Sequence, residues 1–129
     1  MRRALGLLVA LLAACSAAPE APAPVATAGD RLTDQVWLRA DPGAAPGDLL
    51  AFLAGGALLM TSCGEPYRLA RWQRQGDSLQ WDEDGEPIRA RLLALDGEAL
   101  KLEFLLRGGP ETKRYRASRE ARVCPDLPR

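Results

Sequence analysis

The 129-residue chain contains no histidine. Histidine is the commonest general base, the commonest metal ligand and the side chain that titrates near neutral pH. Its absence argues against the catalytic sites, metal centres and pH switches that depend on it. No other catalytic or ligand-binding signature stands out in the sequence. We therefore expect a protein that is not an enzyme and has no cofactor and no metal.

The chain also lacks an excess of charge of either sign, because Lys+Arg and Asp+Glu both number 17. Arg2 and Arg3 belong to a segment that we expect to be removed, which leaves 15 basic and 17 acidic side chains. A nucleic-acid-binding domain would show a basic face, so we expect no nucleic-acid partner. The length suits one small domain, and a hydrophobic content of 47% suits a globular fold.

The N-terminus reads as a targeting segment. Met1–Arg3 is positively charged, and Ala4–Ala13 is an apolar run too short to span a bilayer. Leu12–Cys15, which reads Leu-Ala-Ala-Cys, resembles the bacterial lipobox, where cleavage precedes a cysteine that has received a diacylglyceryl group. The resemblance implies a lipoprotein signal peptide over residues 1–14 and acyl chains such as palmitate on Cys15. An ordinary secretory signal with a chance cysteine is the alternative.

The residues after Cys15 indicate where the protein is held. Ser16 stands where aspartate would favour retention in the inner membrane of enteric bacteria, so we expect a lipid anchor in the outer membrane, facing the periplasm. Residues 15–29 are rich in proline and alanine, which is typical of an extended tether that cannot form a core. The folded domain then spans residues 30–129.

That domain reads as short strands separated by turn dipeptides. We expect strands at Gln35–Ala40, Leu49–Ala54, Ala57–Cys63, Tyr67–Gln75, Ser78–Asp82, Pro87–Leu95, Glu98–Leu106 and Thr112–Ala117. Asp-Gly and Gly-Gly pairs favour tight hairpins, and short connections make neighbouring strands antiparallel. The pattern predicts an all-β fold, a small antiparallel meander of about eight strands that forms a closed or nearly closed lipocalin-like barrel.

One segment is ambiguous. The mostly apolar Asp48–Met60 could form a buried helix, but the central Gly55-Gly56 weakens a helix and favours a two-residue hairpin turn. Alternation in two later strands predicts which side chains face the core. These are Leu100, Leu102, Phe104 and Leu106 in one strand, and Ile88, Ala90, Leu92 and Ala94 in the other.

Two cysteines remain once Cys15 carries lipid. An even pair in a small domain of an oxidising compartment indicates a disulfide between Cys63 and Cys124. The bond would hold the tail after Ala117 against the corner at Cys63–Tyr67. The alternative is that both cysteines are free thiols. Two thiolates without histidine make a poor metal site, and Cys63 has no histidine to activate it as a nucleophile.

Several side chains are candidates for contact with a ligand or partner. Tryptophans in a barrel of this kind line a ligand pocket or fill the core, and basic side chains meet lipid phosphates or another anionic envelope polymer or form a solvated strand face. The candidates are Trp37, Tyr67, Trp72, Trp81, Arg114 and Arg116, the two arginines lying in a basic stretch with Lys113, Arg119 and Arg122.

Acidic residues offer two further possibilities. Asp82–Glu86 packs four carboxylates around a glycine, which could hold Ca²⁺ or form a solvated hairpin tip; it lacks the spacing of an EF-hand loop. Glu65 lies beside Arg68 and Arg71, and we expect a salt bridge at that corner.

The combination of these features resembles a known class of protein. The lipobox, the tether, Val36-Trp37-Leu38, an apolar hairpin and the corner at Cys63–Tyr67 look like small lipocalin-like bacterial lipoproteins, and they are similar to the META (HslJ-like) domain. The META pattern usually has Gly-Cys-Asn before an aromatic residue, and this asparagine is missing here. The resemblance implies a β-barrel in the bacterial envelope and brings no catalytic residue.

Two function classes follow. The first is a membrane-anchored envelope lipoprotein whose non-catalytic barrel is a binding or structural domain for an envelope protein or polymer. The alternative is a carrier of a small apolar ligand inside a lipocalin-like barrel. The interior distinguishes them, because a carrier needs a cavity and a filled core excludes one.

Overall fold

The computed structural model describes residues 31–126, so the expected signal peptide, Cys15 and the tether lie outside the described residues. Within this range every regular element is a strand, and no helix could cross a membrane. The strands are β1 (Val36–Arg39), β2 (Leu49–Phe52), β3 (Ala57–Thr61), β4 (Arg68–Gln75), β5 (Ser78–Glu83), β6 (Glu86–Leu95), β7 (Ala99–Leu106) and β8 (Gly109–Ser118).

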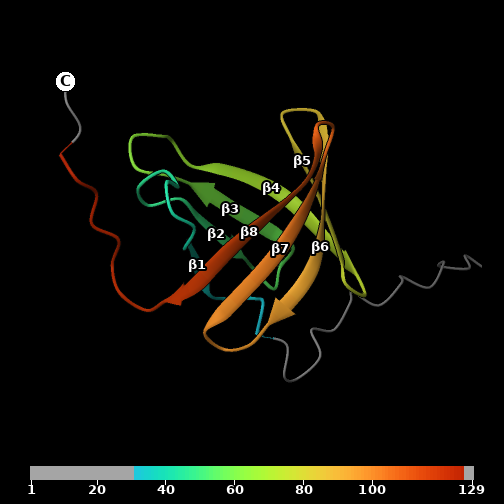
Figure 1. Ribbon diagram of the computed structural model, residues 1–129, viewed down its shortest axis with the longest axis horizontal. Coiled ribbons are helices and arrows are strands. Elements are labelled where there is room, and N and C mark those ends of the chain that lie inside the picture. Colours follow the sequence, from blue (N-terminus) through green and yellow to red (C-terminus); the bar gives the residue numbers. More distant parts are fainter. Residues whose placement is uncertain (1–30, 127–129) are drawn as a thin grey trace, which may run out of the picture.

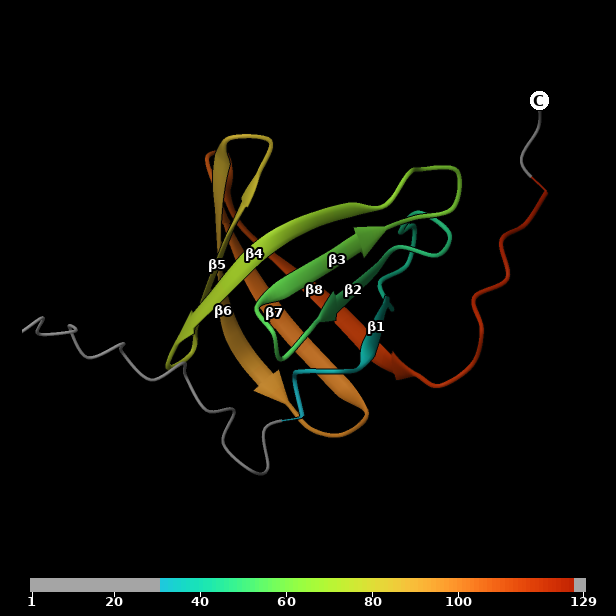
Figure 2. The same cartoon turned by 180° about the vertical axis from the view of Figure 1, so that it is seen from behind.

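Each strand pairs antiparallel with the next, and β8 pairs with β1 to close the barrel (Figures 1 and 2). In the closing pair Trp37 lies opposite Ala117, and Arg39 lies opposite Tyr115. The predicted all-β meander of eight strands is therefore confirmed. Closure leaves no free sheet edge, which removes the main aggregation hazard of a small sheet protein.

The ambiguous apolar segment is a hairpin, as predicted, but its turn differs in detail. The Gly56 amide donates to the Leu53 carbonyl at 2.9 Å, and the Leu53 amide donates to the Ala57 carbonyl at 2.8 Å. Gly56 has a φ of 88°, and Gly55 is not among the positive-φ residues. The loop is thus the three-residue kind, a turn followed by one left-handed residue, and a single glycine meets the conformational demand.

Alternation places most of the predicted side chains inside the barrel. Leu100, Leu102 and Phe104 are buried, and Ala90 is buried opposite Phe104. One prediction is wrong. A register shift between Leu92 and Ala94 turns Ala94 outward and brings Leu95 against the core. Leu106 keeps the regular register of β7 but is 38% exposed because it lies at the end of the strand, beside the hairpin tip.

The segment that precedes β1 covers one end of the barrel. Leu32 is fully buried, and its carbonyl accepts a 2.9 Å hydrogen bond from the Trp37 indole. The Asp34 amide donates to the Phe52 carbonyl, and the Asp34 carboxylate accepts from the Ala54 amide at 3.1 Å. These bonds fix the segment across the end where β2 finishes. At the same end the Trp72 indole donates to the Leu53 carbonyl at 3.0 Å.

Aromatic rings continue the core from this covered end toward the other. Phe52 packs edge-on against Trp72 with ring centroids 5.2 Å apart and against Trp81 at 6.2 Å. Trp81 packs edge-on against Phe104 at 5.7 Å. Such edge-to-face pairs are a favoured geometry for aromatic rings. Trp37, Trp72 and Trp81 therefore lie within the packing of the core, and Phe104 follows Trp81 toward the opposite end.

Candidate functional site

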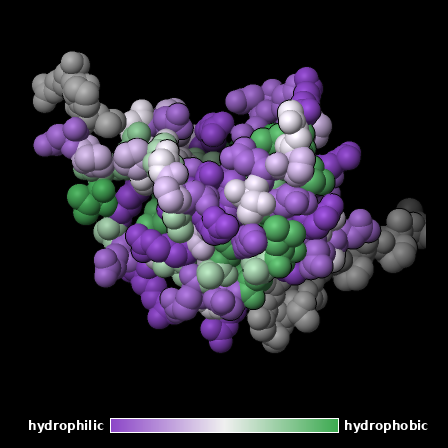
Figure 3. Space-filling view, viewed as in Figure 1, coloured by the Kyte–Doolittle hydropathy of each residue, from purple (hydrophilic) through white to green (hydrophobic). Residues whose placement is uncertain are grey.

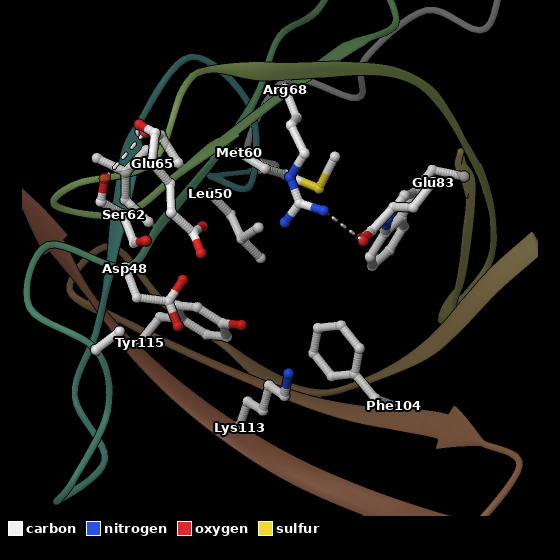
Figure 4. Close-up of a pocket in the computed structure, with 14 residues that line it drawn as sticks. Asp48, Leu50, Met60, Ser62, Glu65, Arg68, Glu83, Phe104, Lys113 and Tyr115 are labelled. Carbon is white, nitrogen blue, oxygen red and sulfur yellow. Dashed lines mark hydrogen bonds and ion pairs between the residues drawn. The ribbon is translucent and has the colours of Figure 1, made fainter. Parts of the chain in front are cut away.

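The opposite end of the barrel is open. The β1–β2, β3–β4, β5–β6 and β7–β8 connections all lie there, because consecutive strands run antiparallel. Between them is a cavity of about 240 Å³ (Figure 4). We call this cavity the mouth. Its floor is apolar, formed by Leu50, Met60, Trp81 and Phe104, and its rim carries charged side chains.

Two rim charges are paired with each other. Arg68, the first residue of β4, reaches into the mouth and contacts Glu83 with an Nη1–Oε2 distance of 3.4 Å. Glu83 also accepts a 2.7 Å hydrogen bond from the indole of Trp81. Arg68 thus pairs with a residue of the adjacent strand β5 rather than with Glu65, and the expected corner salt bridge is not found in residues 31–126.

Two rim carboxylates lie on the side of the β1–β2 and β3–β4 loops. Asp48 and Glu65 both point into the mouth (Figure 4). Asp48 is held by Arg39, whose Nη1 lies 3.3 Å from its Oδ2. The Glu65 carboxylate forms no ion pair with any residue in the described part of the chain.

β8 supplies the facing wall through Lys113 and Tyr115, which alternate along the strand and point inward. The Lys113 ammonium lies 4.3 Å from the centroid of the Phe104 ring, a cation–π contact. No carboxylate among residues 31–126 lies within ion-pair distance of it. Lys113 is therefore a half-buried cation without a counter-charge.

Tyr115 is 4% exposed, and its hydroxyl is directed into the mouth (Figure 4). This hydroxyl forms no hydrogen bond with another described residue. Burial raises the pKa of Tyr115 strongly, the nearby Asp48 and Asp41 carboxylates raise it further, and Arg39 opposes them. The hydroxyl therefore stays protonated and is available as a donor. An unpaired donor that opens into a cavity can be satisfied by a ligand.

A network around Arg39 holds this wall in place. Its Nε lies 2.5 Å from Asp41 Oδ2, and its guanidinium lies over the Tyr115 ring, 5.7 Å from the centroid. Asp41 also accepts a 2.9 Å hydrogen bond from the Arg114 amide. The hydrogen bond from the Arg114 backbone amide, and after it the hydrogen bond from the Arg39 side chain, lowers the pKa of Asp41. The network ties the start of the β1–β2 loop to β8 and so positions Asp48 opposite Tyr115.

The disulfide braces the same rim. Cys63 and Cys124 are bonded, with their Cα atoms 5.6 Å apart, and the prediction of this pair is confirmed. The Cys63 amide donates to the Pro46 carbonyl at 2.8 Å, and Arg122 donates to the Gly47 carbonyl at 2.9 Å. The tail is thereby fixed against the β1–β2 loop.

Most of the site residues named from the sequence lie away from the mouth. Tyr67 is 73% exposed at the β3–β4 corner. Arg114 and Arg116 point outward from β8, where Arg114 Nη1 lies 3.5 Å from Asp41 Oδ1. Of the six candidates for ligand or partner contact, Trp81 alone is among the residues that line the mouth.

Two carboxylates of the acidic hairpin tip, Asp82–Glu86, contact other residues of the chain. Asp82 accepts a 2.7 Å hydrogen bond from the Gly85 amide, and Glu86 pairs with Arg107 at 2.8 Å. Residues 31–126 contain no group of three or more His, Cys, Asp or Glu side chains that could hold a metal ion.

The residues that make the mouth were missed as a set. Lys113 was named within the basic stretch, whereas Asp48 and Tyr115 were not named at all. A signal was present: Lys113, Tyr115 and Ala117 alternate with Arg114 and Arg116, and this alternation assigns them to the inner face of β8. No family model, curated protein or solved structure matches this chain, so function has to be inferred from the geometry of the mouth.

Proposed function

We propose that this protein is a lipid-anchored bacterial envelope lipoprotein, held by Cys15 in the outer membrane and facing the periplasm. Its barrel is a non-catalytic binding domain, and the mouth is its binding site. The lipobox-like start of the sequence and the expected tether support this location. The closed barrel with a single cross-linked tail supports a rigid scaffold that presents the mouth.

One observation carries the binding proposal: Lys113 and Tyr115 both present donors to the mouth, and neither has an acceptor within residues 31–126. A carboxylate or phosphate would satisfy both donors, and charge-assisted hydrogen bonds are the stronger kind. The apolar floor below them fits a short aliphatic or aromatic group. The ligand is thus a small anion with an apolar part, free or at the end of an envelope polymer or protein.

The apolar-carrier alternative finds less support. The barrel is filled by side chains from Leu32 at the covered end to Phe104 beneath the mouth. The remaining cavity of about 240 Å³ is smaller than the range of about 300–1,000 Å³ typical of drug-sized ligands, and its rim is charged. The face seen in Figure 3 is mostly hydrophilic, with apolar side chains in small separate groups, which does not indicate a broad apolar docking surface there.

The test is a titration of the full chain with 4-methylpentanoate, followed through the three indole N–H signals in a ¹H–¹⁵N spectrum. We expect the Trp81 signal, beside the mouth, to shift saturably while the Trp37 signal at the covered end stays fixed. Lys113→Met should abolish the shift. Lys101→Met is the matched control, because Lys101 alternates with the buried Leu100 and Leu102 and faces outward.

Two results would contradict the proposal. One is the absence of a saturable Trp81 shift up to about 50 mM, a concentration that would reveal even affinities weaker than millimolar. The other is equal loss of the shift in Lys101→Met and Lys113→Met, which would show that the anion responds to general charge rather than to the mouth.

A further inference from the structure

Two charged side chains of the mouth, one of each sign, have no ion-pair partner in the described residues. The other charges of the mouth are engaged: Arg68 pairs with Glu83, and Asp48 shares Arg39 with Asp41 and Glu111. The carboxylate of Glu65 and the ammonium of Lys113 remain without an ion-pair partner in the described residues. The two lie on opposite sides of the cavity, Glu65 on the β3–β4 loop and Lys113 on β8 (Figure 4).

From this arrangement we propose that the ligand is a compact zwitterion, with its anionic group on Lys113 and Tyr115 and its ammonium group on Glu65. The inference rests on the proposed function, since it takes the mouth as the binding site. An anion alone would satisfy Lys113 and leave Glu65 in the same confined space, where its negative charge would repel the ligand. A ligand that carries one positive and one negative charge can pair with both Lys113 and Glu65.

The anionic half is defined by an unpaired hydroxyl donor as well as by charge. Tyr115 is 4% exposed, its hydroxyl opens into the mouth, and no other described residue accepts from it. Lys113 and Tyr115 are two residues apart on β8, so both donors come from the same face of one strand. A carboxylate or phosphate with two acceptor oxygens can accept from both at once.

The cationic half is defined by Glu65 and strengthened by Asp48 beside it. Both carboxylates point into the mouth, but Asp48 shares its charge with Arg39 at 3.3 Å. Two neighbouring carboxylates make a more favourable site for a cation than either alone, and Arg39, which also contacts Asp41 and Glu111, neutralises Asp48 only in part. An ammonium has three donors and can reach both.

The apolar floor of the mouth determines which group can lie between the two charges of the ligand. Leu50, Met60 and Phe104 are buried apolar side chains beneath the charged rim. They fit a short aliphatic group attached between the two charges. An α-amino acid with a branched aliphatic side chain has this chemistry in free form, and a phosphoethanolamine headgroup has the same two charges in lipid form.

The test is isothermal titration calorimetry of the full chain with compounds that share one skeleton. Leucine carries both charges, 4-methylpentanoate lacks the amine, and 3-methylbutylamine lacks the carboxylate. We expect leucine to bind at least about tenfold more tightly than either, since each analogue loses one charge-assisted contact. Glycerophosphoethanolamine is the fourth compound, and it tests whether the zwitterion is a lipid headgroup.

Variants assign each half of the ligand. Glu65→Gln should weaken leucine binding and strengthen 4-methylpentanoate binding, because the variant removes the carboxylate that attracts the amine and repels the anion. Lys113→Met should weaken both. Glu98→Gln is the control, because Glu98 is exposed at the opposite end of the barrel, where it pairs with Arg119 at 3.4 Å. An unchanged Trp37 indole signal will show that each variant is folded.

The outcomes separate the two proposals. Equal binding of leucine and 4-methylpentanoate, with no effect of Glu65→Gln, would overturn the zwitterion and leave the anion-binding mouth intact. Failure of all four compounds would overturn both. Tighter binding of glycerophosphoethanolamine than of leucine, with loss in Glu65→Gln and Lys113→Met, would support the zwitterion and assign it to a lipid headgroup.

Discussion

Gly47 is the position where one added methyl group should damage the rim of the mouth most. Its φ is 67°, a left-handed conformation, and a Cβ there would lie 2.6 Å from Cys63 Sγ and 2.6 Å from Arg122 Cδ. The Gly47→Ala variant therefore combines backbone strain with a collision against the disulfide. Because a sulfur bonded to the tail cannot move alone, we expect the β1–β2 loop or the tail to be displaced.

Gly43 separates these two costs. Its φ is 77°, but a Cβ there would meet nothing within 4 Å. Gly43→Ala should thus carry the left-handed strain alone, about 1 kcal/mol, whereas Gly47→Ala adds about 1–3 kcal/mol of overpacking. For a domain of this size 1 kcal/mol corresponds to about 4–8 °C in Tm. We expect Gly43→Ala to lower the Tm by about 5 °C and Gly47→Ala by about 10–20 °C.

The assay is thermal unfolding of the oxidised full chain, followed by near-ultraviolet circular dichroism. It should be repeated in a Cys63→Ser, Cys124→Ser background, where the collision partner is smaller and the tail is released. Coupling between contacting residues predicts a smaller Gly47→Ala penalty in that background. Equal Tm losses for Gly43→Ala and Gly47→Ala, or a Gly47→Ala penalty that the serines do not reduce, would refute this reasoning.

Three further predictions concern other parts of the chain. Cys63→Ser with Cys124→Ser should destabilise the domain by about 4 kcal/mol by denaturant unfolding, because the bond closes a loop of 61 residues; unchanged stability would show that the tail contributes nothing. Asp41→Asn should cost about 1.5–3 kcal/mol above about pH 4 and nothing at strongly acid pH. The direction of this pH dependence follows from the lowered pKa of Asp41 in the folded state: the ionised carboxylate stabilises the fold, and this stabilisation is lost as the pH falls through that pKa. A stability difference between Asp41→Asn and the natural protein that persists at strongly acid pH would contradict it. Cys15→Ala should abolish fatty-acid labelling and release the protein from the membrane fraction, and labelling that persists would exclude this anchor.

The fold was predictable because local signals agree with one another. Glycine and aspartate turns divide the chain into strands, and the period-two alternation of Leu100, Leu102 and Phe104 defines the inner face. The exceptions have local causes. The bulge between Leu92 and Ala94 adds one residue to β6 and reverses the alternation after it, and no residue type marks such a bulge in the sequence.

The site was harder to predict because its residues come from different strands and loops. Glu65 and Lys113 are far apart in the sequence, and only the closure of β8 onto β1 brings them to one cavity. Sequence reasoning paired Glu65 with its neighbour Arg68, whereas the barrel gives Arg68 a partner from the adjacent strand, Glu83. Charge pairing between neighbouring strands depends on register, which composition and spacing do not specify.

The most direct test of the account locates the ligand. The chain has two methionines, and Met60 lies in the floor of the mouth. With ¹³C-methyl methionine in the full chain and leucine in excess, we predict an intermolecular nuclear Overhauser effect between the leucine methyls and the Met60 methyl, lost in Lys113→Met and retained in Lys101→Met. Bound leucine that shows no such effect to Met60 would contradict the claim that this barrel binds its ligand in the mouth.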